Sequence, residues 1–491
     1  FQGNGGRQNV TMAADTTSPP PTAPNVDVEY WVTARAYESI PQLFSAVMGN
    51  FWGASSARAT AAVAKTIVPG NLYALNWEND PGFTRRGGGG IRFREGVGMY
   101  LHGDSTIDAV QGAYIASSAD GSERNYWAVM SDGSVEVISG GTYIRDDGVA
   151  DHPDIFTAAP ENLPDTEPFL DPMRGKGQPP APGPLTPIGI ANGEMQGDCT
   201  ANGGSGTSYG PGAYYAYNPN NNQATGDPIR ITGGCVQFTG GGQFGDYAFY
   251  GGLQFPSTGV SATFGPGRYF MVGALPGNPL FYVRNGNLLQ DMTPLDGAGN
   301  AQPPLDAGEI FVFTAPGYPG LTPPGELSPI IDQLQFGYVE VRTGNNDGSL
   351  INLHGLNGSP GYDWSSIDSR LEYFAPTLFW MDQRNSQILY TPDGNIDTTS
   401  CGPGHTLANP CLNTDPEIPI DPFMQLIASP NADLYGVIYM PRGSYLDFQG
   451  SPGMTSPLQV IAGAINMGGG GLLRLNTPTN RLTRRTVALI E

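Results

Sequence analysis

The chain has 491 residues, of which 70 are Gly and 45 are Pro, and 10% of them are aromatic. Short strands joined by many tight turns fit these values, because disordered chains rich in Gly and Pro are usually poor in aromatic residues. The formal net charge is −22 and Lys occurs only at positions 65 and 176. This argues against nucleic acid and anionic membrane surfaces as partners, because both attract clustered cations.

The first 26 residues form a polar lead that Pro residues break at positions 19–21. Such a segment is too irregular to fold alone. We expect a short strand within it to add to the sheet of another chain. This candidate self-association strand consists of Val10, Thr11, Met12 and Ala13.

A strand–helix–strand pattern follows the lead. Residues 26–32 alternate like a half-buried strand, and residues 56–68 form a second run rich in Ala and Val. Residues 39–51 between them are expected to form the longest helix of the chain, with Ser39 as its cap. Its apolar face would consist of Ile40, Leu43, Phe44 and Val47. Residues 1–68 are therefore predicted to be an N-terminal strand–helix–strand module with an extended lead.

The rest of the chain is predicted to be rich in strands. Residues 69–157 hold short apolar runs between turn signals and form a first β-strand-rich domain, and residues 188–300 form a second. Residues 158–187 contain many prolines and no strand signal, so we expect a semi-rigid linker there. Residues 301–491 are expected to form a C-terminal β-helix-like domain.

The most regular pattern lies near the C-terminus. Four short apolar runs follow one another at nearly even intervals, with Pro, Gly, Asn and Asp between them. These runs are Leu434–Tyr439, Tyr445–Phe448, Leu458–Ala462 and Leu472–Leu475. Upstream, residues 211–215 and 266–270 each place a Pro-Gly turn before an aromatic run, either as a repeated rung or as two unrelated pieces. We therefore predict a mostly β fold with a β-helix-like body of stacked short strands.

The four Cys fall into two local pairs, Cys199 with Cys235 and Cys401 with Cys411. An even count with local pairing in a chain rich in Gly and Pro is typical of disulfides in an oxidising compartment. We therefore expect both disulfides and an extracellular or cell-surface location. The alternative at the second pair is a metal site that uses His405, although no second Cys-x-x-Cys motif accompanies it.

Residues that could carry a reaction are scattered. Asp382 and Arg384 lie beside Trp380 and could line a charged cleft, although an ion pair at the end of a strand is favoured. A group that could supply paired carboxylates for glycoside cleavage consists of Asp363, Asp368 and Glu372. We nevertheless predict that the protein is not an enzyme and that it has no catalytic residue.

No cofactor is predicted. Two acidic loops, Asp291–Asp296 and Asn345–Gly348, could hold an incidental Ca²⁺ ion through oxygen ligands, although neither fits an EF-hand loop. The aromatic clusters Tyr214–Tyr217 and Tyr247–Tyr250 could bind carbohydrate, but such residues more often form the core of a β stack or contacts between subunits.

Several segments resemble a known family when they are taken in order. They read SIPQLF, NLYALN, EPFLDPMRGKGQPPAP, FGPGRYFMVGAL, YGVIYMPRGSYLDFQG and QVIAGAINMGGGG. This order resembles the extracytoplasmic part of the TadG-like proteins associated with Tad/Flp pilus assembly, over roughly residues 26–476. The terminal segment matches well, whereas Met381-Asp-Gln-Arg384 departs slightly from the family's Q-D-R segment.

Family members usually carry an N-terminal membrane anchor, whereas this sequence contains no apolar run of about 18 residues. It begins with Phe1 rather than Met, so we expect that the chain is processed or truncated.

The resemblance implies a non-enzymatic structural protein of the bacterial cell envelope or exterior. It would act in pilus-associated assembly, in adhesion, or as a subunit of an extracellular filament or surface layer. We expect a homo-oligomer or filament, with other pilus or envelope proteins as further partners. Two alternatives stay open: a polysaccharide-binding or polysaccharide-cleaving β-helix protein, and a viral capsid jelly-roll protein.

Overall fold

The structure is a computed structural model. It describes separate strands up to residue 162 and then, with short gaps, residues 171–290, 307–342, 350–391, 397–403, 411–412, 423–468, 473–476 and 482–489. The chain divides into two compact units, Phe1–Val68 with Thr483–Glu491 and Pro69–Leu482. Among the described residues, no helix is long and apolar enough to cross a membrane.

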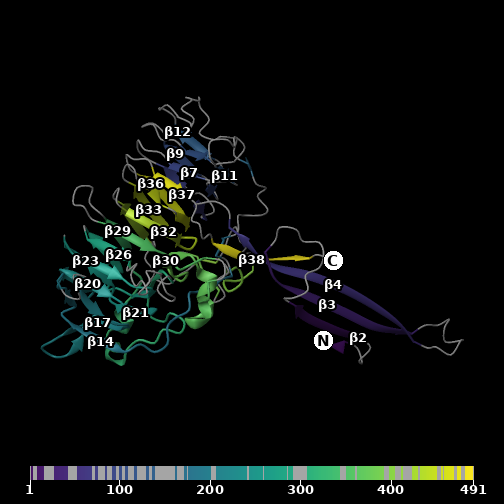
Figure 1. Ribbon diagram of the computed structural model, residues 1–491, viewed down its shortest axis with the longest axis horizontal. Helices are drawn as coiled ribbons and strands as arrows, with labels where there is room; N and C mark the ends of the chain where they lie inside the picture. Colours follow the sequence, from purple (N-terminus) through teal and green to yellow (C-terminus); the bar gives the residue numbers. More distant parts are fainter. Residues whose placement is uncertain are drawn as a thin grey trace, which may run out of the picture. The chain divides into compact units, whose positions relative to one another are not determined.

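The larger unit is a solenoid of parallel strands with three faces, as predicted for the body of the chain (Figure 1). Each full coil contributes one strand to each face. Face 1 holds, in stacking order, β14 (Pro187–Ala191), β17 (Gly212–Asn218), β21 (Gly245–Tyr250), β24 (Gly267–Val272), β27 (Glu309–Thr314), β30 (Thr377–Met381), β32 (Ala432–Tyr439), β35 (Leu458–Ala462), β5 (Leu72–Ala74), β8 (Met99–Leu101), β11 (Val129–Ser131) and β13 (Glu161–Asn162).

Face 2 holds β15 (Glu194–Gln196), β19 (Ile229–Gly233), β22 (Leu253–Phe255), β25 (Phe281–Arg284), β28 (Val339–Arg342), β31 (Phe423–Ala428), β33 (Tyr445–Gly450), β36 (Ala464–Gly468), β6 (Phe83–Arg85), β9 (Ser105–Asp108) and β12 (Val135–Ile138). Face 3 consists of two ladders. The first holds β16 (Thr207–Tyr209), β20 (Cys235–Phe238), β23 (Ser261–Phe264), β26 (Asn287–Gln290), β29 (Ile351–His354) and the start of β32. The second holds β34 (Thr455–Ser456), β37 (Leu473–Asn476), β7 (Ile91–Arg94) and β10 (Ile115–Ser118).

The stacking order of the coils differs from the order of the chain. On face 1, β35 pairs with β5, so that Val460, Ile461 and Ala462 lie opposite Leu72, Tyr73 and Ala74. The same junction continues on face 2, where β36 pairs with β6, and on face 3, where β37 pairs with β7. Figure 1 shows this seam as yellow strands beside blue ones. The first coils of the chain therefore stack on the last, and the winding restarts at the far end of the solenoid with β14.

Aligned aromatic side chains fill the interior of the solenoid. Tyr247 stacks on Tyr269 with ring centroids 4.9 Å apart, and Tyr269 stacks on Phe311 at 5.0 Å. Phe379 of the next coil meets Phe311 edge to face at 5.6 Å. Because parallel strands repeat in register, each inward position falls above the same position of the previous coil, and a continuous core results.

Glycine turns the corner between face 1 and face 2. Gly251 and Gly252 both have φ of 91°, a conformation that other residues rarely adopt. A Cβ on Gly252 would lie 2.5 Å from the carbonyl oxygen of Leu280 in the next coil. This corner shows physically why a solenoid of short strands needs so many glycines.

Both predicted disulfides are present, Cys199–Cys235 and Cys401–Cys411. The first joins the connection that follows β15 to β20 in the next coil. Among the described strands, β14, β15 and β16 each pair with one neighbouring coil only. A cross-link at this place stabilises a coil that pairs along one edge only in the described part of the chain.

The smaller unit is an antiparallel sheet in the order β1 (Gln2–Gly3), β2 (Gln8–Asp15), β3 (Asp27–Pro41), β4 (Trp52–Ile67) and β38 (Thr483–Leu489). The predicted strands at 26–32 and 56–68 are confirmed within β3 and β4, but the predicted helix is wrong at its start. Ser39, Ile40 and Pro41 continue β3 and lie opposite Ala54, Gly53 and Trp52 of β4. Cross-strand pairing outweighs the local capping signal there. The rest of that prediction, residues 42–51 with Leu43, Phe44 and Val47, lies outside the described residues.

The division into several strand-rich domains also needs correction. Strands from 69–157, 188–300 and 301–491 belong to one compact unit and stack in common sheets. Residues 171–186 do not separate two domains, because they lie against several coils of the solenoid. The strands of the larger unit pair in parallel, whereas those of a jelly roll are antiparallel. The fold therefore does not support the alternative of a viral capsid jelly-roll protein.

Candidate functional site

The strongest polar cluster lies on the outer side of face 1, beneath residues 171–186, which we call the return segment. Strands β24, β27 and β30 are buried along their whole length, although a solenoid strand needs to bury only its inward side. The outer side is therefore covered as well. This explains why these strands read as continuous apolar runs rather than alternating ones.

Asp382 is the centre of this cluster and is completely buried. Its two carboxylate oxygens accept hydrogen bonds from the Gln178 amide, the Thr314 hydroxyl, and the backbone and guanidinium of Arg384. The Gln178 side chain of the return segment also accepts a hydrogen bond of 2.9 Å from the Trp380 indole. We call Gln178, Thr314, Asp382 and Arg384 the latch.

The latch corrects the idea of an open charged cleft. The distance from Arg384 Nη2 to Asp382 Oδ2 is 2.6 Å, and the Arg384 guanidinium also lies over the Phe336 ring, 5.5 Å from its centroid. A carboxylate that already accepts five hydrogen bonds is poorly placed to exchange a proton with a substrate. The favoured interpretation as an ion pair at the end of a strand agrees with this geometry.

Further contacts hold the return segment on both sides of the latch. The Tyr318 hydroxyl donates to the Pro179 carbonyl over 2.6 Å, and Arg268 donates to the Pro180 carbonyl over 3.0 Å. Near the start of the segment, the Tyr439 hydroxyl donates to Asp171 over 2.9 Å. Burial raises the pKa of both tyrosines, so their hydroxyls remain protonated donors. The segment is therefore fixed by groups from several successive coils.

The three carboxylates considered for glycoside cleavage have separate surroundings. Asp363 caps the short 3-10 helix η5 (Trp364–Ser366) by accepting from the Ser365 amide. Asp368 caps η6 (Ser369–Phe374) and also pairs with Arg370 and, over 3.0 Å, with Arg268. Glu372 lies within η6. Two of the three residues therefore cap the N-termini of short helices and hold connections in place.

Asp368 belongs to a partly buried charge network. Burial alone would raise the pKa of Asp368, but hydrogen bonds from Arg370 and the charges of Arg268 and Arg370 outweigh it and hold that pKa below its ordinary value. Arg268 in turn makes a two-pronged contact with Asp246, at 2.7 and 2.9 Å. The network joins η6, face 1 and the return segment.

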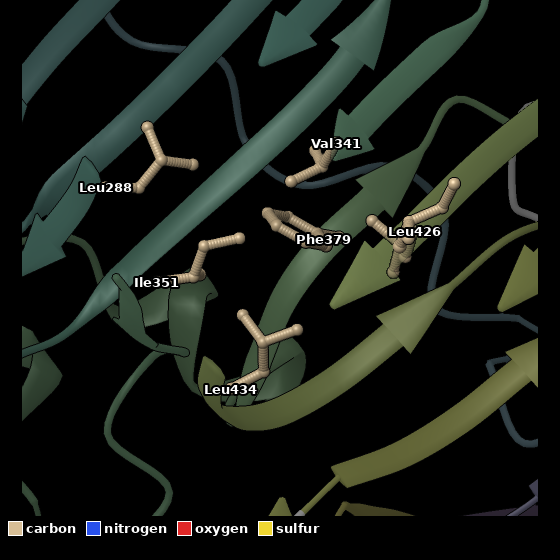
Figure 2. Close-up of a pocket in the computed structure, with 7 residues that line it drawn as sticks. Leu288, Val341, Ile351, Phe379, Leu426 and Leu434 are labelled. Atoms are coloured by element: carbon tan, nitrogen blue, oxygen red, sulfur yellow. The ribbon is translucent and has the colours of Figure 1, made fainter. Parts of the chain in front are cut away.

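A small apolar pocket lies between coils in the interior of the solenoid (Figure 2). Its labelled side chains point toward one another from strands on all three faces. The lining consists of Leu288, Val341, Ile351, Phe379, Leu426, Ile427 and Leu434. With no polar group in its lining, this pocket is an imperfection of core packing rather than a site that could orient a substrate.

The structure places the remaining candidates as follows. The candidate self-association strand lies in β2 and pairs with β3 of the same chain; it consists of Val10, Thr11, Met12 and Ala13. Tyr214, Tyr247 and Tyr250 are buried. Cys401 and Cys411 are oxidised and so cannot be thiolate ligands, and no cluster of three metal-binding side chains occurs among the described residues. His405 and both candidate Ca²⁺ loops lie outside the described residues.

Sequence reasoning missed the polar row on the outside of face 2. Asp447 accepts from Gln425 over 2.6 Å, from Gln449 over 3.0 Å and from Asn466 over 2.9 Å. Arg342 extends the row by donating to Gln425 and pairing with Glu340. The row runs across four neighbouring strands, β28, β31, β33 and β36, and only their parallel register brings these residues together.

No protein-family model matches the chain, and neither a curated protein nor a solved structure shows significant similarity to it.

The latch generates a prediction about stability. Replacing Asp382 by Ala removes the carboxylate that pairs with Arg384 and accepts from the Gln178 amide, so we expect a loss of about 3–5 kcal/mol in the free energy of unfolding. Denaturant unfolding measures this loss, and proteolysis near Gln178 should become faster. The matched control is Asp332→Ala in η4 (Ile331–Gln333), an exposed position where we expect a change within about 0.5 kcal/mol. Equal unfolding midpoints for the two variants would contradict the role of the latch.

Acid should weaken the Asp368 network. Because the folded pKa of Asp368 is lowered, its stabilisation is complete above the unfolded value of about 3.9 and is lost as pH falls through the folded value. We expect the thermal midpoint of the wild type to fall in this acid range. Asp368→Asn should have a lower midpoint at pH 7 and a smaller acid-induced fall, whereas Asp332→Asn should follow the wild type. Parallel pH profiles for all three proteins would rule out this contribution.

Proposed function

We propose that the protein is a non-enzymatic structural protein of the bacterial cell envelope or exterior. It acts in pilus-associated assembly or as a subunit of an extracellular filament or surface layer. The observation that carries the proposal is the exposed sheet of the smaller unit. Residues 35–38 of β3 and 55–59 of β4 are exposed, although they lie in strands of 15 and 16 residues. Residues 52–60 of β4 also pair with β3 alone among the described strands, and an open strand edge of this kind can pair with another chain.

The end of the solenoid is a less suitable place for assembly than the smaller unit. The terminal coil of the solenoid, formed by β14, β15 and β16, pairs on one side only among the described strands. Pro187 at the start of β14 lacks a backbone donor, which limits uncontrolled pairing there. Controlled assembly is therefore more readily assigned to the smaller unit than to the solenoid end.

The location and the family are part of the same proposal. Two disulfides and a mostly β, solenoid-like fold are consistent with an extracellular protein. Membership of the TadG-like group rests on the segments that resemble it, and the adhesive role rests on that resemblance too. The charge clusters around Asp382 and Asp368 act in holding connections in place, which favours a structural role over a reaction.

Polysaccharide binding is the second candidate function. The observation that favours it is the polar row on face 2, where carboxylate, amide and guanidinium groups line up on successive strands. Tyr282 lies in register with Glu340 of this row and is partly exposed. Retention on immobilised polysaccharide that is lost in Asp447→Ala would favour this candidate over assembly.

Assembly is tested by light scattering and electron microscopy of the native material. We expect species well above 51.9 kDa, and deletion of residues 1–25, which removes β2, should reduce them. Circular dichroism should show that the deleted protein retains its β structure. A protein that stays monomeric at high concentration, with or without these residues, would contradict the proposal.

A further inference from the structure

The sheet of the smaller unit has two unlike faces. Residues directly opposite one another in an antiparallel sheet share a face. One face carries the rows Val10–Ala36–Ala57, Met12–Ala34–Ala59 and Ala14–Val32–Ala61. The other carries Asn9–Tyr37–Ser56, Thr11–Arg35–Arg58 and Ala13–Thr33–Thr60. All nine positions of the first three rows are apolar, and we call them the apolar face.

The apolar face is open to solvent. Met12 is 73% exposed and Val10 is 38% exposed, and both are among the large hydrophobic residues with the greatest exposure. Ala36, Ala57 and Ala59 are exposed as well. A few antiparallel strands are marginally stable unless a hydrophobic face is packed against something. We therefore expect another surface to pack against the apolar face.

Charge favours a second copy of the chain at this face. The residues of the smaller unit include six Lys and Arg and five Asp and Glu, which leaves 17 Lys and Arg and 40 Asp and Glu in the larger unit. Two solenoids repel each other through this acidic excess, whereas two nearly neutral sheets do not. The smaller unit is thus the part of the chain through which copies can meet with the least repulsion.

Side-chain size points to the arrangement. The larger residues of the first two rows, Val10 and Met12, both lie on β2, whereas β3 and β4 contribute only alanines there. A two-fold axis parallel to the strands would place β2 of one copy over β4 of the other. Met12 would then fill the shallow surface at Ala59 of its partner, and the contact would occur twice.

The available area is sufficient for a dimer. Strand β3 has 15 residues, which corresponds to a length of about 50 Å at ~3.3 Å per residue. Three strands at ~4.8 Å spacing make this side of the sheet about 10–14 Å wide, so two copies packed along its whole length would bury roughly 1,000–1,400 Å² in total. This total is at the lower end of the range for specific interfaces. The apolar face spans five of the 15 residues of β3 and supplies about a third of this area.

We propose that the apolar face is the dimer interface of the protein, with β2 of each copy packed over β4 of the other. This inference rests on the assembly function proposed above and names the surface and the partner.

Two substitutions at neighbouring positions of β4 test the interface. Ala59→Glu puts a charge in the apolar face, whereas Thr60→Glu puts the same charge on the opposite face. By multi-angle light scattering over a concentration series, Ala59→Glu should raise the dissociation constant of the dimer at least 100-fold and Thr60→Glu less than threefold. Circular dichroism should show both variants folded. If Ala59→Glu associates as the wild type does while assembly persists, the inference is wrong and the proposed function stands. If the wild type is monomeric, both are wrong.

A charge pair tests the arrangement of the two copies. Met12→Lys alone should be monomeric like Ala59→Glu, because each puts an unpaired charge into the interface. Mixing the two variants should restore a dimer with one copy of each, since the introduced ammonium of one copy would then face the introduced carboxylate of the other. A mixture that remains monomeric would overturn the packing of β2 over β4.

Discussion

The structure depends on one constraint, the register of parallel strands. Two neighbouring parallel strands of one face cannot be joined by a tight hairpin turn, so the chain makes a complete coil between them. Each coil therefore has to place its strands in register with those of the previous coil on every face. Tyr247, Tyr269 and Phe311 stack because this register places them one above another. The same register creates the polar row around Asp447 on the outside of face 2. Core and surface are thus consequences of one backbone pattern.

The seam between β35 and β5 follows from the same constraint. A terminal coil exposes unpaired backbone donors and acceptors as well as apolar side chains. Stacking the first coils of the chain on the last removes two such ends at once. The chain must then reach the far end of the solenoid to resume winding, and the return segment lies on that route. Its polar contacts, with the latch at their centre, fix this long connection against face 1.

The sequence predicted the local features well. The four apolar runs near the C-terminus are confirmed as strands, in β32, β33, β35 and, displaced by one residue, β37. Both cysteine pairs were predicted because the partners lie close together in the chain. The Pro-Gly segments at 211–215 and 266–270 both begin strands on face 1, because a tight turn before an aromatic run is what a solenoid corner requires.

Features that depend on distant pairing were not predictable. Nothing local in Val460–Ala462 indicates that Leu72–Ala74 is its neighbour. Ser39 and Pro41 are typical of a helix start, yet pairing with β4 extends the strand through them. Asp382 was recognised as part of an ion pair, but Gln178 was not recognised as its partner, because the two residues are 204 positions apart in the sequence.

The seam is the central claim about this fold, and a designed disulfide tests it most directly. Ala74 and Ala462 are register partners in adjacent parallel strands, at a spacing of about 4.8 Å that a disulfide can bridge. All four native cysteines are already paired, so the two introduced thiols are the only free ones. After oxidation of Ala74→Cys/Ala462→Cys, mass spectrometry of unreduced peptides should show a link between these two positions within a monomer. Two free thiols under the same conditions, in a folded protein, would contradict the seam.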